Sequence, residues 1–335
     1  MTDGRYPGAA GDRDAWILAR RPERNRIDEN RAYAALLEAE PGPDGVVRNV
    51  ATVFLSNREC PYRCLMCDLW KNTLPERVRP GAIPRQLDAA LAGMPDATAI
   101  KLYNAGSFFD AKAIPPEDFA AIAQRLRAFE RVIVECHPAL VGPPVERFRD
   151  LIDGALEVAM GLEVADDDLL ARLNKRMTLA SYVDAARKLR RMGVASRAFV
   201  LVQPPFVTPG RAVPLAVASA RFAFAHGAGA VSLIPVRAGN GALDALAAVG
   251  DFTEPSLATI EDAFDGALAQ GGGRVFTDVW DLERFSSCPV CFGARAGRIR
   301  EMNLSQRPVP RAGSAACAAC AACGHAPAAR TSMGA

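Results

Sequence analysis

The stretch Cys60-Pro-Tyr-Arg-Cys64-Leu-Met-Cys67 decides how this 335-residue chain is interpreted, because it gathers three thiols on one short segment. No further Cys or His follows before Cys136, so the segment cannot complete a four-ligand zinc or iron site locally. Three thiolates at Cx3Cx2C spacing can instead hold three irons of a 4Fe-4S cluster and leave the fourth iron open. The spacing therefore predicts a cluster whose open iron can take part in chemistry.

Two simpler explanations of the three cysteines compete with this one. They could belong to a zinc site completed from the C-terminal cysteines, or they could be unrelated buried thiols. The usual zinc knuckle is Cx2C, and the three-residue gap departs from it. Residues 51–57 (ATVFLSN) also form a short, mostly apolar run typical of a strand, which puts the cysteines just beyond its C-terminal end. Parallel α/β barrels build their sites on that side.

Composition sets wider limits on the chain. Hydrophobic residues make up 50% of it, and its length allows a barrel of about 200–250 residues with flanking pieces. A net charge of +2 neither requires nor excludes a nucleic-acid partner. All nine cysteines except Cys136 are clustered, which favours metal sites in a reducing compartment over disulfides. Without an apolar signal core or a membrane-length apolar run, we expect a soluble cytoplasmic protein that does not enter a membrane.

The N-terminal part predicts a flexible and helical segment over residues 1–45. Residues 1–12 are Gly-rich and polar, which is typical of disorder. Residues 14–40 carry a helical pattern that Pro22 should break into two pieces. The basic run at 20–26 is either a solvated face or a contact for nucleic acid or phosphate.

From residue 51 onward, short apolar runs alternate with helical segments, which is the β-α rhythm of a parallel sheet. The candidate strands are 51–57, 99–103, 131–136, 156–163, 197–203 and 230–236. Six such units predict an α/β fold built as a partial, TIM-like (β/α)6 barrel over residues 46–250. An ordinary barrel with two unrecognised units remains the alternative.

Residues 251–335 predict a small Cys-rich C-terminal extension with a helix near 257–269 and a strand at 274–278. Two Cx2C pairs in it are typical of a structural zinc site, with candidate ligands Cys288, Cys291, Cys320 and Cys323. Cys317 and His325 are spare ligands. The alternatives are an auxiliary iron-sulfur cluster and an Ala-rich tail whose cysteines bind no metal.

Polar residues follow several of the candidate strands. In the loop after the second strand, Gly106 permits a close backbone approach, while Asn104 and Ser107 offer hydrogen bonds to a small zwitterion. Glu163 ends the fourth strand, where it could accept hydrogen bonds from hydroxyl or ammonium groups or face the next helix dipole. Gln203 ends the fifth strand, and the two prolines after it fix the exit of the chain.

The order of these motifs resembles the radical S-adenosylmethionine (SAM) superfamily. The motifs are CPYRCLMC, NAGSFFD, VECHP, GLEVADDDLLARLNK and LVQPPF, spread over roughly residues 45–310. Their order is similar to the branch that contains the catalytic subunit of Elongator and the radical SAM subunit of archaeosine synthase. The resemblance implies that SAM binds the open iron and is cleaved reductively to a 5'-deoxyadenosyl radical, which abstracts hydrogen from a substrate.

The same resemblance implies the ligands and partners. Cys60, Cys64 and Cys67 would hold the cluster, and a one-electron reductant such as flavodoxin or ferredoxin would supply the electron. The residues implied for SAM are Asn104, Gly106, Ser107, Glu163 and Gln203.

Two departures from the pattern limit what can be transferred. Met66 stands where most of the superfamily has an aromatic residue, and His137 stands where this branch tends to show arginine. His137 could line a pocket or be a structural, hydrogen-bonded residue. The substrate is therefore left open between a tRNA base and a small molecule or peptide. A non-catalytic, zinc-stapled binding protein is the alternative from another class, and it would be colourless.

Overall fold

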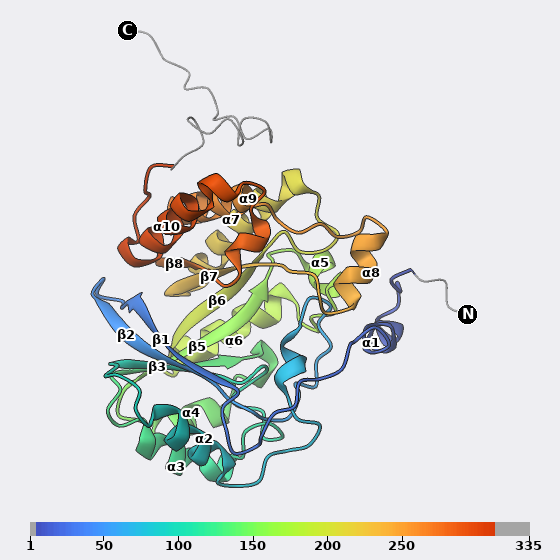
Figure 1. Cartoon of the computed structure of the whole chain (residues 1–335). Coiled ribbons are helices and arrows are strands. Elements are labelled where there is room, and N and C mark those ends of the chain that lie inside the picture. Colours follow the sequence, from blue (N-terminus) through green and yellow to red (C-terminus); the bar gives the residue numbers. More distant parts are fainter. Residues whose placement is uncertain (1–4, 312–335) are drawn as a thin grey trace.

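A computed structural model describes residues 5–311 of the chain. Its centre is one eight-stranded sheet in which the strands follow one another in chain order (Figure 1). The first pair is antiparallel, and every later pair is parallel. The strands are β1 (Ala34–Pro41), β2 (Val47–Phe54), β3 (Ala99–Tyr103), β4 (Arg131–Cys136), β5 (Ala155–Glu163), β6 (Ala195–Val202), β7 (Ala230–Pro235) and β8 (Arg274–Thr277).

Helices connect the parallel strands and cover one face of the sheet. Because each crossover has the same hand and moves to the next strand, the crossover helices that pack on the sheet fall on the same side, and the sheet curls away from them. The helices are α1 (Ala10–Leu18), α2 (Ala82–Leu91), α3 (Phe119–Arg125), α4 (Pro143–Arg149), α5 (Asp167–Arg172), α6 (Leu179–Arg191), α7 (Pro209–Ala225), α8 (Ala242–Ala248), α9 (Leu257–Leu268) and α10 (Pro289–Ser305). α1 precedes the sheet, and the segment after it packs against the start of α8. Short 3-10 turns are η1 (Leu69–Asn72), η2 (Pro116–Asp118), η3 (Pro138–Leu140) and η4 (Leu282–Phe285).

The two faces of each strand have different roles. In β4, Val132 and Val134 belong to the apolar core under the helices. Arg131 and Glu135 alternate with them and point to the other face, because side chains alternate along a strand. That other face is the lumen of a partial barrel.

Contacts between strands that are not neighbours demonstrate the curvature. Arg197 of β6 pairs with Glu40 of β1, with 2.6 Å between Nη2 and Oε1. The ring of Phe199, also on β6, lies 6.1 Å from the ring of Tyr103 on β3. These strands are separated in the sheet, so their side chains can meet only across the lumen.

The fold prediction is confirmed, with differences at the edges. All six candidate strands form, and the strand expected at 274–278 is β8. The helix predicted for the second half of residues 14–40 is wrong, because Ala34–Pro41 is the antiparallel edge strand. α1 begins at Ala10, inside the stretch predicted to be disordered, and ends at Leu18 before Pro22. Among the described residues, no helix has the length and apolar character needed to cross a membrane.

Candidate functional site

The three clustered cysteines lie on the loop between β2 and η1, beyond the C-terminal end of β2. All three are free thiols on partly exposed residues. Burial of their side chains raises the pKa of Cys60 and Cys67 to about 12 and that of Cys64 to about 11. The metal-free thiols are therefore protonated at neutral pH, and a metal must displace those protons to bind.

Residues that follow later strands hold the backbone of this cysteine loop, defined here as residues 60–67, through hydrogen bonds. The N–H of Leu65 donates to the carbonyl of Leu173 at 2.9 Å. Nδ2 of Asn174 donates to the carbonyl of Arg63 at 2.7 Å. Nδ2 of Asn240 donates to the carbonyl of Leu65 at 2.9 Å. These hydrogen bonds from outside the loop fix its backbone conformation.

The basic segment at residues 20–26 lies beside the cysteine loop. Oε1 of Glu59 lies 2.7 Å from Nη1 of Arg21 and 3.0 Å from Nη1 of Arg63, and Arg24 pairs with the same carboxylate. The guanidinium of Arg21 also lies 4.5 Å from the ring centre of Trp70. Two arginines of this run thus bind the protein itself, which favours a structural role over a free nucleic-acid contact.

The loop after β3 comes close to Cys60. A Cβ added to Gly106 would lie 3.2 Å from Cβ of Cys60, so a glycine permits this approach. The N–H groups of Asn104 and Gly106 donate to Oε1 of Glu135, at 2.5 and 3.3 Å. Burial raises the pKa of Glu135 to about 7.

Asn104 has no exposed surface, and neither polar atom of its amide has a hydrogen-bond partner among residues 5–311. Buried amides without partners are rare, because each lost hydrogen bond costs free energy. Asn104 is therefore the side chain at this edge that is best prepared for a polar ligand.

Glu163 ends β5 and forms a buried ion pair with Lys175, with 2.5 Å between Oε1 and Nζ. A side chain at Gly161 would overlap both charged groups, so a glycine leaves room for the pair. Burial raises the pKa of Cys60, Cys64 and Glu135, and the positive charge of Lys175 offsets part of that rise, as expected for an ammonium group near the cysteine loop. The sequence analysis did not single out Lys175.

The other polar residues at this edge are hydrogen-bonded within the protein. Oγ of Ser107 accepts the N–H of His137 at 2.8 Å. Nε2 of Gln203 donates to the carbonyls of Thr253 and Glu254, at 2.7 and 3.2 Å. These contacts order the strand ends.

His137 is a satisfied structural residue in this arrangement. Its ring stacks on Tyr62 with centroids 3.9 Å apart, Nδ1 accepts the N–H of Ala139, and Nε2 lies 3.1 Å from the carbonyl of Lys175. Burial lowers its pKa to about 4, which keeps the ring neutral. Of the two roles considered for His137, the contacts favour the structural one.

The lumen below this edge has two layers. Aromatic rings from separate strands meet in the upper layer, with Tyr103 6.0 Å from Phe54 and 6.1 Å from Phe199, and all three residues are partly exposed. The lower layer is a network of buried and partly buried charges toward the N-terminal ends of the parallel strands, where the antiparallel β1 contributes its C-terminal end. We call this network the charged floor. It consists of Glu40, Lys101, Arg131, Glu157, Arg197 and Arg274.

Comparison with known families assigns the part of the chain that carries these residues. The model of the radical SAM superfamily matches residues 55–209, which include the cysteine loop, the loop after β3 and the end of β5. This part of the chain belongs to the radical SAM superfamily. The protein is thus an enzyme of a family that works with a 4Fe-4S cluster and SAM.

Curated relatives lie at low identity. An uncharacterized protein of Methanocaldococcus jannaschii is 22% identical over 231 residues, which cover 64% of this chain and 63% of that protein. The match therefore spans less than two thirds of that relative. Archaeosine synthase subunit beta of Methanosarcina acetivorans is 24% identical, with 79% of this chain and 81% of the relative covered. Among solved structures, Elp3 of Methanocaldococcus infernus gives a TM-score of 0.46 at 13% identity, covering 59% of this chain and 51% of Elp3.

The residues present fit a radical SAM cofactor set. Thiolates are the usual protein ligands of a 4Fe-4S cluster, and the unpartnered Asn104 amide lies on the loop that approaches Cys60. Within residues 5–311, no three His, Cys, Asp or Glu side chains converge on a single point as a one-ion site would require. A four-iron cluster is larger than one ion, so its ligands need not converge so tightly.

The predicted zinc site is only half within the described part of the chain. Cys288 and Cys291 are both buried, at the N-terminal end of α10. Cys317, Cys320, Cys323 and His325 lie outside the described residues.

Proposed function

We propose that Cys60, Cys64 and Cys67 ligate three irons of a 4Fe-4S cluster and that SAM binds beside them at the C-terminal ends of the strands. The observation that carries the proposal is the buried Asn104 amide, whose polar atoms lack partners among the described residues, on a loop that approaches Cys60 through Gly106. A polar ligand in this position would satisfy the amide.

Several side chains have defined tasks in this proposal. The cluster and SAM together supply a 5'-deoxyadenosyl radical, which abstracts hydrogen from a carbon of the substrate. Asn104 hydrogen-bonds the amino-acid part of SAM, and the Lys175 ammonium attracts its carboxylate. Glu163 holds Lys175 in place, and Glu135 keeps the loop at residues 104–106 in shape through its backbone N–H groups.

The other residues predicted to bind SAM lie at the same C-terminal ends of the strands. Gly106 lets the loop approach the cluster, while Ser107 and Gln203 contact SAM from the ends of β3 and β6. A one-electron reductant of the flavodoxin or ferredoxin class in a reducing cytoplasm supplies the electron.

For the substrate, a tRNA base is one candidate, supported by the similarity to archaeosine synthase subunit beta. The partly exposed aromatic rings of Tyr103 and Phe199 suit a flat ring, because aromatic rings stack on one another. The engagement of Arg21 and Arg24 by Glu59 favours the alternative, a small molecule or peptide. Binding of tRNA that weakens steeply with added salt would support the first candidate, and no binding at low salt would exclude it.

We propose in addition that Cys288 and Cys291, with Cys320 and Cys323, bind a structural zinc ion that closes the C-terminal extension at residues 251–335. Burial of Cys288 and Cys291 supports this, and an auxiliary iron-sulfur cluster is the alternative. Cys291→Ala should remove one zinc per chain and speed proteolysis of the extension. Unchanged zinc content and protease resistance would refute the proposal.

The first experiment is anaerobic purification, followed by measurement of iron, sulfide and zinc and of 5'-deoxyadenosine formed from SAM with a reductant. We expect about four irons per chain and reductant-dependent SAM cleavage. Zinc without iron after cluster reconstitution, in a colourless protein, would favour the zinc-stapled binding protein.

A further inference from the structure

Asn240 joins the C-terminal half of the cysteine loop to the barrel. It follows β7 and precedes α8, and its side chain is buried, with 2% of the residue exposed. Nδ2 donates to the carbonyl of Leu65 at 2.9 Å and to the carbonyl of Cys67 at 3.2 Å. Oδ1 accepts the N–H of Leu243 at 2.7 Å. Both ends of the amide are thus engaged, and a flipped amide would set oxygen against two carbonyls.

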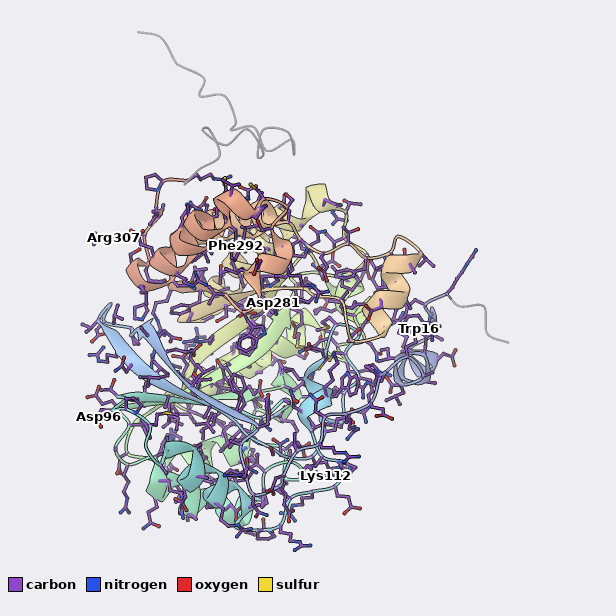
Figure 2. All side chains as sticks on the ribbon, in the orientation of Figure 1. Trp16, Asp96, Lys112, Asp281, Phe292 and Arg307 are labelled. Carbon is purple, nitrogen blue, oxygen red and sulfur yellow. The ribbon has the colours of Figure 1, made fainter. Side chains whose placement is uncertain are left out.

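The segment that carries Asn240 is itself fixed. Gly241 has a φ of 83°, and a side chain there would overlap the carbonyl of Arg20, so the chain before α8 packs directly on the segment after α1. Figure 1 shows α1 beside α8, and Figure 2 labels Trp16 at this junction. On the other side, Nζ of Lys71 donates to the carbonyl of Gly239 at 2.6 Å. Asn240 is therefore a fixed point for the loop.

The two halves of the cysteine loop have different anchors. Asn174 and the carbonyl of Leu173 hold the middle of the loop at Arg63 and Leu65. Asn240 holds the carbonyl of Leu65, the residue directly after Cys64, and the carbonyl of Cys67 itself. Fixing these carbonyls fixes the separation of two ligands in the proposed set.

We propose that Asn240 is a positioning residue that holds Cys64 and Cys67 in their ligating arrangement and so retains the cluster. The inference rests on the proposed function, in which these thiolates bind iron. Asn240 contacts neither iron nor SAM in this role. It acts through the backbone, as hydrogen-bond partners outside the ligand set do in other metal sites.

The test separates two tasks of the amide. Asn240→Ser keeps an oxygen that can accept the Leu243 N–H, because serine is a good helix cap, but it removes the donor to the loop. Asn240→Asp keeps the shape and the acceptor and turns an oxygen toward the two carbonyls. Asn303→Ser is the matched control, because the Asn303 amide also makes two hydrogen bonds to the backbone, but away from the cysteine loop. Its Nδ2 donates to the carbonyl of Thr277 on β8 at 2.9 Å, and its Oδ1 accepts the N–H of Thr277 at 2.8 Å.

Each reconstituted protein is incubated anaerobically with an iron chelator, and loss of the visible cluster absorbance is timed. Low-temperature EPR spectra of the reduced clusters and thermal melting of the apo-proteins are recorded alongside. We expect both Asn240 variants to lose the cluster about 10- to 100-fold faster than the wild type, with an altered EPR spectrum. We expect Asn303→Ser to match the wild type, and all apo-proteins to melt as cooperative folds.

Two results would overturn the inference alone. One is wild-type cluster lifetime and EPR spectrum in both Asn240 variants. The other is equally fast loss in Asn303→Ser, which would indicate general destabilisation. A wild-type protein that takes up no cluster would instead overturn the proposed function, and this inference with it.

Discussion

The two ends of the lumen both bury ionisable groups, but they do so differently. In the charged floor, carboxylates face cations at short range: Nε of Arg197 lies 2.7 Å from Oε1 of Glu157, and Nζ of Lys101 lies 2.7 Å from Oε2 of Glu40. At the C-terminal strand ends, Asn104 has no partner among the described residues, and Glu135 accepts only backbone N–H groups. The carboxylates of the floor are paired with cations, and the opposite end keeps an unpartnered amide at Asn104.

The pKa shifts express the same difference. Burial alone would raise the pKa of Glu40, but Arg197 and Lys101 hold it well below its ordinary value. Burial dominates at Glu135 and raises its pKa to about 7. Ionised pairs at the N-terminal strand ends therefore stabilise the fold, and the C-terminal ends carry the groups available to a ligand, as expected for a barrel enzyme.

The largest expected effect is on chemistry at the C-terminal strand ends. Cys64→Ala should reduce iron binding and SAM cleavage to background, because two thiolates cannot hold the proposed cluster. Stability should change little, because the cysteine is on a loop. Cys136→Ala is the matched control, since it removes a buried thiol outside the cysteine loop and should keep both iron and SAM cleavage. Wild-type 5'-deoxyadenosine formation by Cys64→Ala would refute the ligand assignment.

The next effect is on stability at the floor. Glu40→Gln removes one of the two carboxylates of the charged floor, so that Arg197 keeps only Glu157 and Lys101 keeps only the partly exposed Glu38. The buried cations then outnumber their carboxylate partners, and we expect the free energy of unfolding to fall by about 3–5 kcal/mol in urea titration. SAM cleavage per folded molecule should stay near wild type. Glu130→Gln is the control, because the Glu130 side chain is 71% exposed and should change stability by less than about 0.5 kcal/mol. Equal stability of the two variants would show that the ion pairs of the charged floor do not stabilise the fold.

The sequence predicts the parallel strands well but not the edge strand. Apolar runs such as 99–103 and 131–136 identify buried strands whatever their neighbours are. Residues 34–41 (AALLEAEP) are rich in good helix formers, yet they pair with β2. Tertiary context overrides propensity there, because Glu38 and Glu40 meet Lys101 across the lumen. The alternation of those two glutamates is the only local trace of a strand.

Some residues of the candidate site can be predicted from the sequence, and others can be found only in the structure. Spacing identifies Cys60, Cys64 and Cys67, because the chemistry of a cluster restricts which residues hold it. Position after a strand brings Asn104 and Glu163 into consideration. Lys175 and Asn240 could not be found, because their roles depend on a buried ion pair and on carbonyls far away in the sequence.

A smaller effect should appear at Asn104. Asn104→Ala removes no hydrogen bond made by the side chain to the described residues, so stability should not fall through lost hydrogen bonding. SAM affinity of the cluster-loaded protein should fall by about 1–3 kcal/mol, measured by equilibrium dialysis. Asn49→Ala, which removes an exposed amide bonded to the Asp96 carbonyl, should leave SAM affinity unchanged. Unaltered affinity in Asn104→Ala would mean that the unpartnered amide is not part of the SAM site.

The smallest effect concerns acid. Because the folded-state pKa of Glu40 lies below its ordinary value of 4.5, its contribution to stability is present above that value and is lost as the pH falls. Between pH 5 and pH 4 the unfolded chain takes up on average about half a proton at this site, which removes about 0.7 kcal/mol. Urea titrations of wild type and Glu40→Gln at both pH values should differ by this amount, with the wild type losing more. An equal loss in both proteins would show that Glu40 is not held ionised by its cations, and the contrast with Glu135 would fail.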